Sequence, residues 1–306
     1  MAAISAIPPG RRVTASGSVR SRRAADAVAT IVLWAMASSI IIMLAAFIIY
    51  MVYLGWSALT PSFIFGMPEE TTAGGGIGPE IYNSFYILIL TLIFTVPIAI
   101  AAGVYLQEYE HAGRFRTVVQ FSAESLATIP SVVMGLFGLL VFVYLLKWHF
   151  TALGGALTLT LLNLPALMRV TQEALASVPD TLREASMGLG GTKWQTITRV
   201  VLPSAIGRLT TGIVLIAGRI FGETAALIFT AGLSVPYNNP YSLNPFRPAE
   251  TLAVHLWYTH SESIVPDVAR IGNGSALVLL IMVLLFNVSA RIVGRQLTKR
   301  FTGRAE

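Results

Sequence analysis

The chain has 306 residues, of which 55% are hydrophobic and only 12% charged, and its mean hydropathy is +0.70. An average soluble domain carries about 25% charged residues, so this composition excludes a disordered chain, a nucleic-acid-binding module and an ordinary soluble enzyme. The absence of cysteine excludes a disulfide scaffold, a cysteine nucleophile and a thiolate metal site.

Residues 1–28 form a basic tail, which we expect to be poorly ordered. Beyond it, long stretches contain no Asp, Glu, Lys or Arg: the first separates Asp26 from Glu69, and others cover 81–107, 125–146 and 271–290. A helix that crosses roughly 30 Å of hydrocarbon needs about 20 apolar residues, and each stretch accommodates one. Two less regular apolar segments cover 151–168 and 209–232.

The sequence therefore predicts an all-α polytopic membrane protein. We expect six transmembrane helices, near residues 30–55, 82–107, 121–146, 150–172, 207–232 and 273–295. The connecting segments 57–79 and 234–270 read as loops on one side of the membrane, the second with a short helix near 249–260.

Lys and Arg lie mainly on the other side of these predicted helices. The two tails and the loops after the second and fourth helices hold 16 of them, whereas the opposite side holds 3. Because Lys and Arg stay on the cytoplasmic side, both termini are predicted to be cytoplasmic. The net charge of +6 is thus explained by topology, and no nucleic-acid partner is expected.

The longest loop on the basic side has a helix–turn–helix pattern. Thr181 and Glu184 have capping-box spacing and predict a helix that ends at Gly190-Gly191, and Thr192 with Gln195 predicts a second helix. Such a segment suits a docking element and an ordered connector equally well.

Three charged residues lie inside predicted helices. Arg219 and Glu223 are four residues apart in 207–232, so they are predicted to share one face. Ionised groups at bilayer depth are costly unless they pair or face a cavity, which favours a pathway role over a pair that only fixes this helix to a neighbour. Arg169 either lines the exit of a pathway or extends to the membrane interface.

Enzyme signatures are missing. The chain has no G-x-x-x-x-G-K-[S/T], so it is not predicted to be an ATPase, and neither H-E-x-x-H nor G-x-S-x-G occurs. We expect no catalytic residues, no metal site and no cofactor bound by this chain.

The residues of the basic loop also match a known pattern. Glu184, Ala185 and Ser186 are followed by Gly190 and then by Leu202 and Pro203. This resembles the EAA loop of ABC-importer permeases, E-A-A-x3-G-x9-I-x-L-P, with Ser186 in place of alanine and valine at position 200 in place of isoleucine. Residues 103–109, 129–138, 169–175 and 222–227 make the chain similar to the PstA-type permease subunits of phosphate-specific (Pst) ABC importers.

The resemblance implies a type I ABC-importer permease fold. It implies a permease domain over 29–298, a C-terminal tail over 299–306, and a coupling segment (residues 176–206) that contacts an ATPase between Glu184 and Trp194, Lys193 included. Arg219, Glu223 and Arg169 would then lie along the path of phosphate.

The resemblance also implies partners and a location. The partners would be a PstC-type permease subunit, two copies of a PstB-type ATPase that bind ATP and Mg, and a PstS-type phosphate-binding protein, at the cytoplasmic membrane of a bacterium. Two alternatives stay open: an ABC importer for another small solute (sulfate, molybdate or phosphonate), and an ion-coupled secondary transporter.

Overall fold

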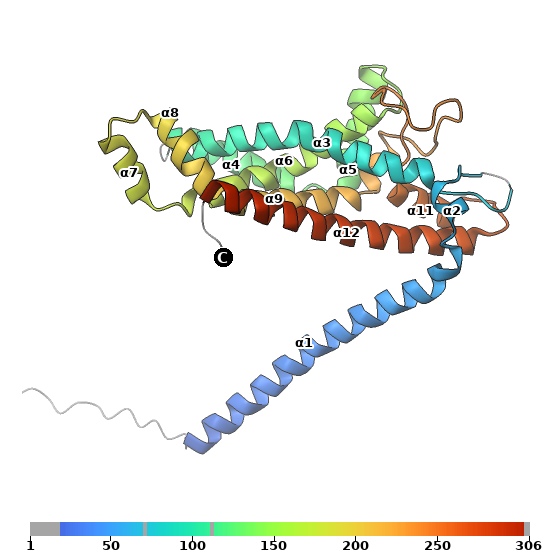
Figure 1. Ribbon diagram of the computed structural model, residues 1–306, viewed down its shortest axis with the longest axis horizontal. Helices are drawn as coiled ribbons and strands as arrows, with labels where there is room; N and C mark the ends of the chain where they lie inside the picture. Colours follow the sequence, from blue (N-terminus) through green and yellow to red (C-terminus); the bar gives the residue numbers. More distant parts are fainter. Residues whose placement is uncertain (1–18, 70–71, 111–112, 303–306) are drawn as a thin grey trace, which may run out of the picture. The chain divides into compact units, whose positions relative to one another are not determined.

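The computed structural model describes residues 19–69, 72–110 and 113–302, which fold into helices joined by turns and loops (Figure 1). In chain order the elements are α1 (Val19–Gly55), η1 (Trp56–Ala58), α2 (Pro61–Phe65), α3 (Gly78–Val104), η2 (Tyr105–Tyr109), α4 (Arg114–Ala127), α5 (Ser131–Gly138), η3 (Leu139–Leu145), α6 (Ala152–Ala176), α7 (Asp180–Gly188), α8 (Lys193–Thr196), η4 (Ile197–Val201), α9 (Leu202–Phe221), α10 (Ala225–Ile228), α11 (Leu252–Ser261) and α12 (Val268–Thr302).

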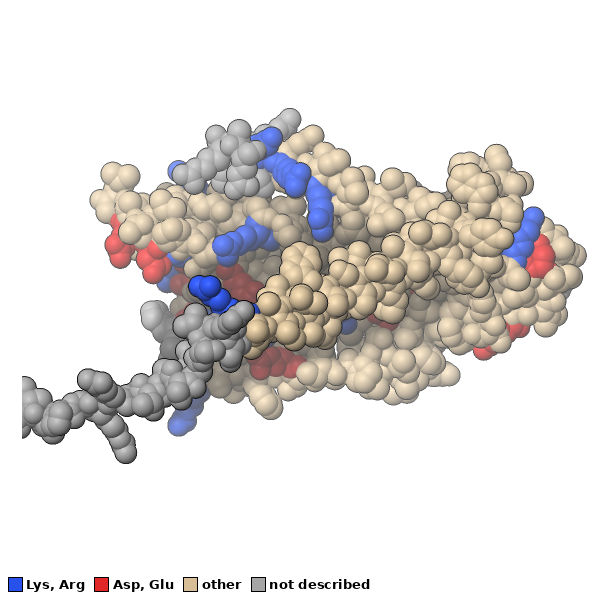
Figure 2. Space-filling view, turned by 90° about the horizontal axis from the view of Figure 1, so that it is seen from below, with Lys and Arg blue, Asp and Glu red and all other residues tan. Residues whose placement is uncertain are grey.

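The predicted membrane helices are confirmed in number. Among the described residues, 5 helical segments are long and apolar enough to cross a membrane, and the bent pair formed by α4 with α5 and η3 makes up to 6 if it crosses as one span. The five are Arg23–Ala58, Gly78–Tyr109, Ala152–Ala176, Lys193–Phe221 and Val268–Gln296. On the face seen in Figure 2, charged side chains gather towards the ends, with mostly uncharged surface between them.

The prediction of one straight helix over 121–146 is wrong. Arg114–Ala127 and Ser131–Leu145 meet at an angle of 99°. The break falls just before Pro130, whose ring lacks the N–H donor and pushes the preceding residue, Ile129, out of the helical region. This span is therefore two helices at nearly a right angle.

The chain divides into two compact units, residues 1–53 and 54–306. In the first unit, the side chains of residues 23–47 in α1 are all exposed. A helix that is apolar on every side and has no packing partner among the described residues of its own unit is typical of a membrane span. Of the predicted N-terminal tail 1–28, residues 1–18 lie outside the described residues, and residues 19–28 belong to α1. Of the predicted C-terminal tail 299–306, the part up to Thr302 belongs to α12.

Four long helices, α3, α6, α9 and α12, make the core of the second unit, and α11 packs against α3 and α12. Glycines allow the closest approaches. A Cβ atom on Gly103 of α3 would lie 2.6 Å from Thr171 Cβ on α6, and one on Gly212 of α9 would lie 2.2 Å from a methyl group of Val170. Small residues at such crossings let helix backbones pack closely where lipid provides no hydrophobic drive for association.

We expect Gly103→Ala to destabilise the protein by about 1–3 kcal/mol, because the added methyl group overpacks the contact between α3 and α6. The matched control is Gly218→Ala in α9, where a Cβ atom would have its nearest neighbour at 3.5 Å. The measurement is the thermal unfolding temperature of the purified protein in detergent. Equal unfolding temperatures for the two variants would contradict the close packing at Gly103.

Candidate functional site

The coupling segment (residues 176–206) folds as α7, a glycine turn, and α8. Helix α7 begins at Asp180 after Pro179 and has no side-chain cap, so the predicted capping box at Thr181 is wrong. Asp180 instead places a negative charge in the first turn, where the helix dipole favours it. Gly190 has φ +86°, a conformation that favours glycine, and it forms the predicted stop after α7.

The second predicted capping box is present. Thr192 Oγ1 accepts a hydrogen bond from Gln195 N at 3.2 Å, and Gln195 Oε1 accepts one from Thr192 N at 2.9 Å. From Lys193 the helix continues through η4 into α9 without a break. Leu202 and Pro203 therefore lie in the first turn of α9, immediately after η4. Pro203 has no N–H to donate to a backbone hydrogen bond, and the π-helical turn η4 lies next to this irregular point.

The turn between α7 and α8 carries solvent-exposed apolar side chains. Leu189 is 91% exposed and Trp194 is 62% exposed, and both Glu184 and Ala185 are exposed beside them. Ser186 turns inward and shares a 2.9 Å hydrogen bond with Thr196. Apolar side chains on a rigid, capped turn make a surface suited to a protein partner.

Arg183 ties this surface to the membrane helices. Its guanidinium donates to Glu108 Oε1 at 2.7 Å, to Leu175 O at 2.9 Å and to Val178 O at 2.7 Å. The side chains of Arg183 and Glu108 are only 15% and 8% exposed. The hydrogen bond to Glu108 raises the pKa of Arg183, a shift that burial partly opposes.

A second contact joins the same two regions. Lys193 Nζ lies 5.0 Å from the centre of the Tyr109 ring, a cation–π arrangement between α8 and η2. Sequence reasoning missed Glu108 and Arg183 as functional residues. Each lies inside or beside a stretch that carries the resemblance, but 75 residues separate them and nothing local pairs them.

Arg219 and Glu223 do not share a helix face, so that prediction is wrong. Helix α9 ends at Phe221 with Gly222 as its C-cap, and α10 begins at Ala225. Arg219 is exposed and, among the described residues, forms no ion pair. Glu223 is half-buried and accepts a 3.4 Å hydrogen bond from Ala226 N at the start of α10.

Arg169 lies on α6 with its side chain 67% exposed. It pairs with Glu173 at 3.2 Å on the same helix and with Glu124 of α4 at 3.8 Å. Exposed pairs of this kind add little stability.

The comparisons with known proteins agree with the membrane architecture. Residues 95–303 match the family model described as binding-protein-dependent transport system inner membrane component. The probable ABC transporter permease protein YqgI of Bacillus subtilis is 43% identical over 92% of this chain and 99% of its own length. The phosphate transport system permease protein PstA of Xylella fastidiosa is 37% identical over 71% of this chain and 74% of its own.

Two solved structures share the fold. A bacterial alginate ABC transporter in complex with its alginate-bound periplasmic protein matches with a TM-score of 0.66, at 17% identity, over 92% of this chain and 99% of the other. The MetNI methionine ABC transporter matches with a TM-score of 0.57, at 18% identity, over 72% of this chain and 94% of the other. The fold predicted from the sequence, that of an ABC-importer permease, is confirmed.

We expect Glu108→Gln to reduce the local stability of α7 by on the order of 3 kcal/mol, because it leaves a buried guanidinium without its counter-charge. The matched control is Asp180→Asn. Asp180 also pairs with Arg183, at 3.0 Å, but its side chain is 87% exposed, so its removal costs less than about 1 kcal/mol. Hydrogen exchange of the α7 amides measures both effects. Equal protection in the two variants would show that Arg183 does not depend on Glu108.

Proposed function

This chain belongs to the binding-protein-dependent transport system inner membrane components, and from that premise we propose that it carries inorganic phosphate inward as one permease subunit of an ATP-driven importer. The observation that carries the substrate assignment is the similarity to several phosphate transport system permease proteins PstA, at 34–37% identity. The chain is not an enzyme, and ATP hydrolysis belongs to partner subunits.

We infer that the complex contains a PstC-type permease subunit, two PstB-type ATPases with bound ATP and Mg, and a PstS-type phosphate-binding protein. Both termini then lie in the cytoplasm of a bacterium, and ATP and Mg are bound by the ATPase and not by this chain. The distribution of Lys and Arg supports this orientation.

The exposed turn of the coupling segment is the proposed ATPase contact. Leu189 and Trp194 would enter the ATPase surface, with Glu184, Ala185, Gly190 and Lys193 around them. Motion of α7 is expected to pass through Arg183 to Glu108, and so to the end of α3. Tilting of the two permease subunits against each other would then alternate access to the pathway.

Arg219 is the proposed phosphate contact in the pathway. An exposed guanidinium without an ion-pair partner can offer its fork of N–H donors to phosphate oxygens. Glu223, close in sequence, would keep phosphate from binding too tightly for release. Arg169 is proposed to contribute positive charge farther along the same path.

We expect Arg219→Gln to lower binding-protein-dependent phosphate uptake by roughly 10- to 100-fold, because hydrogen bonds to charged groups contribute about 1.5–3 kcal/mol. The matched control is Arg208→Gln, also exposed and also on α9. The measurement is uptake of labelled phosphate into proteoliposomes that contain the assembled importer.

Normal uptake by Arg219→Gln would remove this residue from the pathway. If the wild-type complex hydrolyses ATP but imports sulfate, molybdate or phosphonate instead, the architecture stands and the phosphate assignment is wrong. Uptake driven by an ion gradient without ATP would instead indicate a secondary transporter.

We expect Gly190→Ala to weaken docking of the ATPase by roughly 5- to 30-fold, because a side chain at positive φ costs about 1–2 kcal/mol. The matched control is Gly188→Ala, the last residue of α7, where a methyl group also has open space but φ is not positive. ATPase activity stimulated by the binding protein measures the effect. Equal stimulation in both variants would show that the turn geometry is not needed for coupling.

A further inference from the structure

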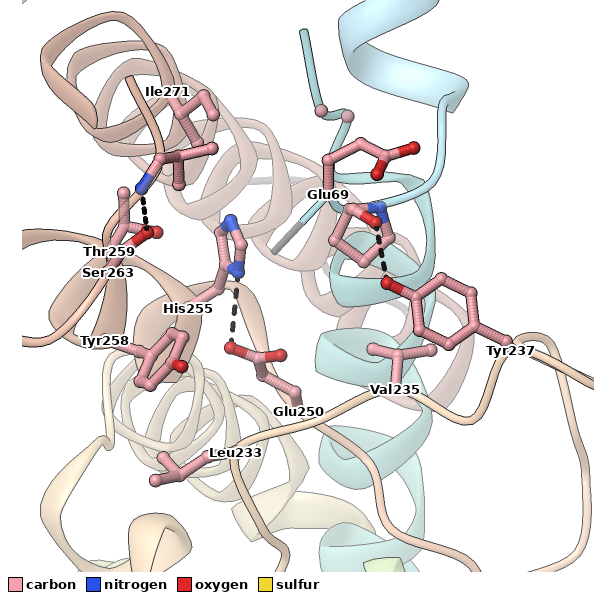
Figure 3. Close-up of a pocket in the computed structure, with 14 residues that line it drawn as sticks. Glu69, Leu233, Val235, Tyr237, Glu250, His255, Tyr258, Thr259, Ser263 and Ile271 are labelled. Carbon is pink, nitrogen blue, oxygen red and sulfur yellow. Dashed lines mark hydrogen bonds and ion pairs between the residues drawn. The ribbon is translucent and has the colours of Figure 1, made fainter. Parts of the chain in front are cut away.

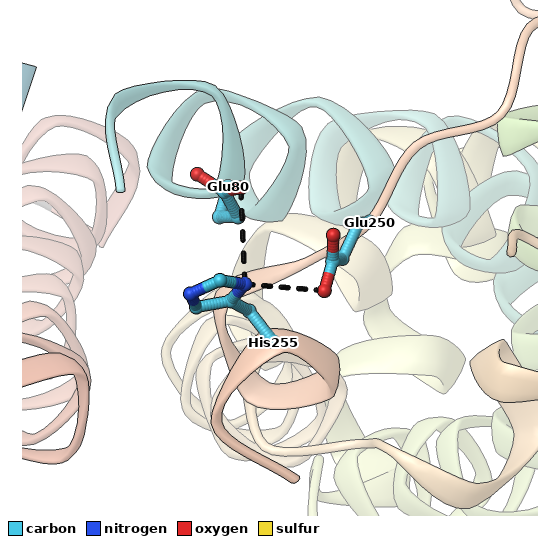
Figure 4. A group of neighbouring side chains, drawn as sticks. All are labelled: Glu80, Glu250 and His255. Carbon is cyan, nitrogen blue, oxygen red and sulfur yellow. Dashed lines mark hydrogen bonds and ion pairs between the residues drawn. The ribbon is translucent and has the colours of Figure 1, made fainter. Parts of the chain in front are cut away.

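A buried cluster of three titratable side chains lies at the other end of α3 from the coupling segment. Glu80 is in the first turn of α3, Glu250 lies two residues before α11, and His255 is in the first turns of α11 (Figure 4). His255 Nδ1 is 3.2 Å from Glu250 Oε1 and 3.9 Å from Glu80 Oε1. One possible ligand atom from each of the three residues lies within 4.8 Å of the other two.

The Glu80 carboxylate is the least satisfied group in this cluster. Glu80 is 0% exposed, and neither of its oxygens has a hydrogen-bond partner among the described residues. It points towards His255 (Figure 4). A buried carboxylate without hydrogen bonds is costly unless it is neutralised or coordinates a cation.

The charges of the cluster point to a divalent cation. With both carboxyl groups ionised, the cluster carries a net negative charge in a buried space, even when the imidazole is protonated. The cluster therefore attracts positive charge, and a divalent cation with a neutral imidazole would balance both carboxylates.

We propose that Glu80, Glu250 and His255 form a binding site for a divalent transition-metal cation, with Zn²⁺ the best fit. One imidazole nitrogen and two carboxylate oxygens are a donor set that Zn²⁺ accepts at about 2.0–2.2 Å. In a tetrahedral site these lengths put neighbouring ligand atoms about 3.4 Å apart. The separations of 3.2 Å and 3.9 Å from His255 Nδ1 bracket that value, and no pair of the three ligand atoms is farther apart than 4.8 Å, so an inward shift of Glu80 would bring the set towards tetrahedral spacing.

The backbone around the cluster is held in place. Asn83 Nδ2 donates to Glu250 O at 3.1 Å, and Ser84 Oγ accepts from Leu252 N at 2.9 Å. These bonds join the first turns of α3 to the residues that precede and begin α11. Ligands on a fixed backbone need little reorganisation when the ion enters.

The cluster also has an entry path and room for a fourth ligand. Glu250 and His255 line a pocket whose other walls include Glu69, Tyr237 and Tyr258 (Figure 3). A water or a solute anion in this pocket can complete the coordination. The ion would then hold α3, the segment before α11 and α11 itself in one arrangement at this end of the protein.

No sequence pattern indicates this site, and the expectation of no metal ligands rests on the absence of cysteine and of a histidine motif. Glu80 and Glu250 are 170 positions apart in the numbering, and no local motif joins them. The proposal goes beyond transport of phosphate, and its test measures binding without transport, so either can fail alone.

The test uses the purified, assembled complex after removal of metals with a chelator. Equilibrium dialysis against Zn²⁺, with metal analysis, is expected to give one ion bound per chain. Glu80→Gln and His255→Gln should each weaken binding at least about tenfold. His260→Gln, an exposed histidine on the same helix, is the matched control and should bind as the wild type does. Cobalt(II) bound to the wild type should give the strong visible absorption of a tetrahedral site.

A second measurement keeps the result independent of folding. Zn²⁺ should raise the unfolding temperature of the wild type and of His260→Gln, but not that of Glu80→Gln. The Glu80→Gln variant loses a buried charge, so it is expected to keep its stability without metal. Absence of Zn²⁺ binding to the wild type, or unchanged affinity in Glu80→Gln, would overturn the site. If the wild type binds no Zn²⁺ and Glu80→Gln is more stable than the wild type, a proton neutralises the cluster in place of a metal ion.

Discussion

The contact between Arg183 and Glu108 is the interaction on which the coupling end of the molecule depends. One guanidinium joins the first turns of α7, two carbonyl groups at and just beyond the end of α6, and the carboxylate that follows α3. Its planar fork suits this task, since a lysine offers no such set of fixed directions. The exposed apolar turn of the coupling segment can therefore transmit a displacement, because it is anchored to two membrane helices and continues directly into a third.

The membrane imposes the second constraint. Backbone groups in lipid must be bonded within the protein, so the spans are helical and their irregular points need a chemical reason. Three of those points coincide with proline or glycine: Pro130 at the bend between α4 and α5, Pro203 after η4, and Gly222 at the end of α9. The last of these leaves Arg219 in the final turn of α9, where the helix dipole favours a cation.

Much of this fold follows from local sequence. The membrane spans were predictable because charge-free runs are long, and the Thr192 capping box because its two partners are three residues apart. The bend at Pro130 and the end of α9 were missed because a hydropathy window averages over single residues. The pairing of Arg183 with Glu108, and of His255 with Glu80, could not be predicted at all. Such contacts depend on tertiary packing that brings distant segments together.

Helix α3 and η2 form one continuous span of 32 residues, from Gly78 to Tyr109, with Glu80 in its first turn and Glu108 near its last residue. Each residue in a helix adds about 1.5 Å and a turn of about 100°. The number of residues between the two glutamates therefore fixes the directions in which their side chains leave the helix relative to each other. A single insertion or deletion along this span would turn one glutamate away from its partner, whereas an exchange of one lipid-facing apolar side chain for another would leave both glutamates in place. The length of this helix therefore constrains the protein more strictly than its apolar composition.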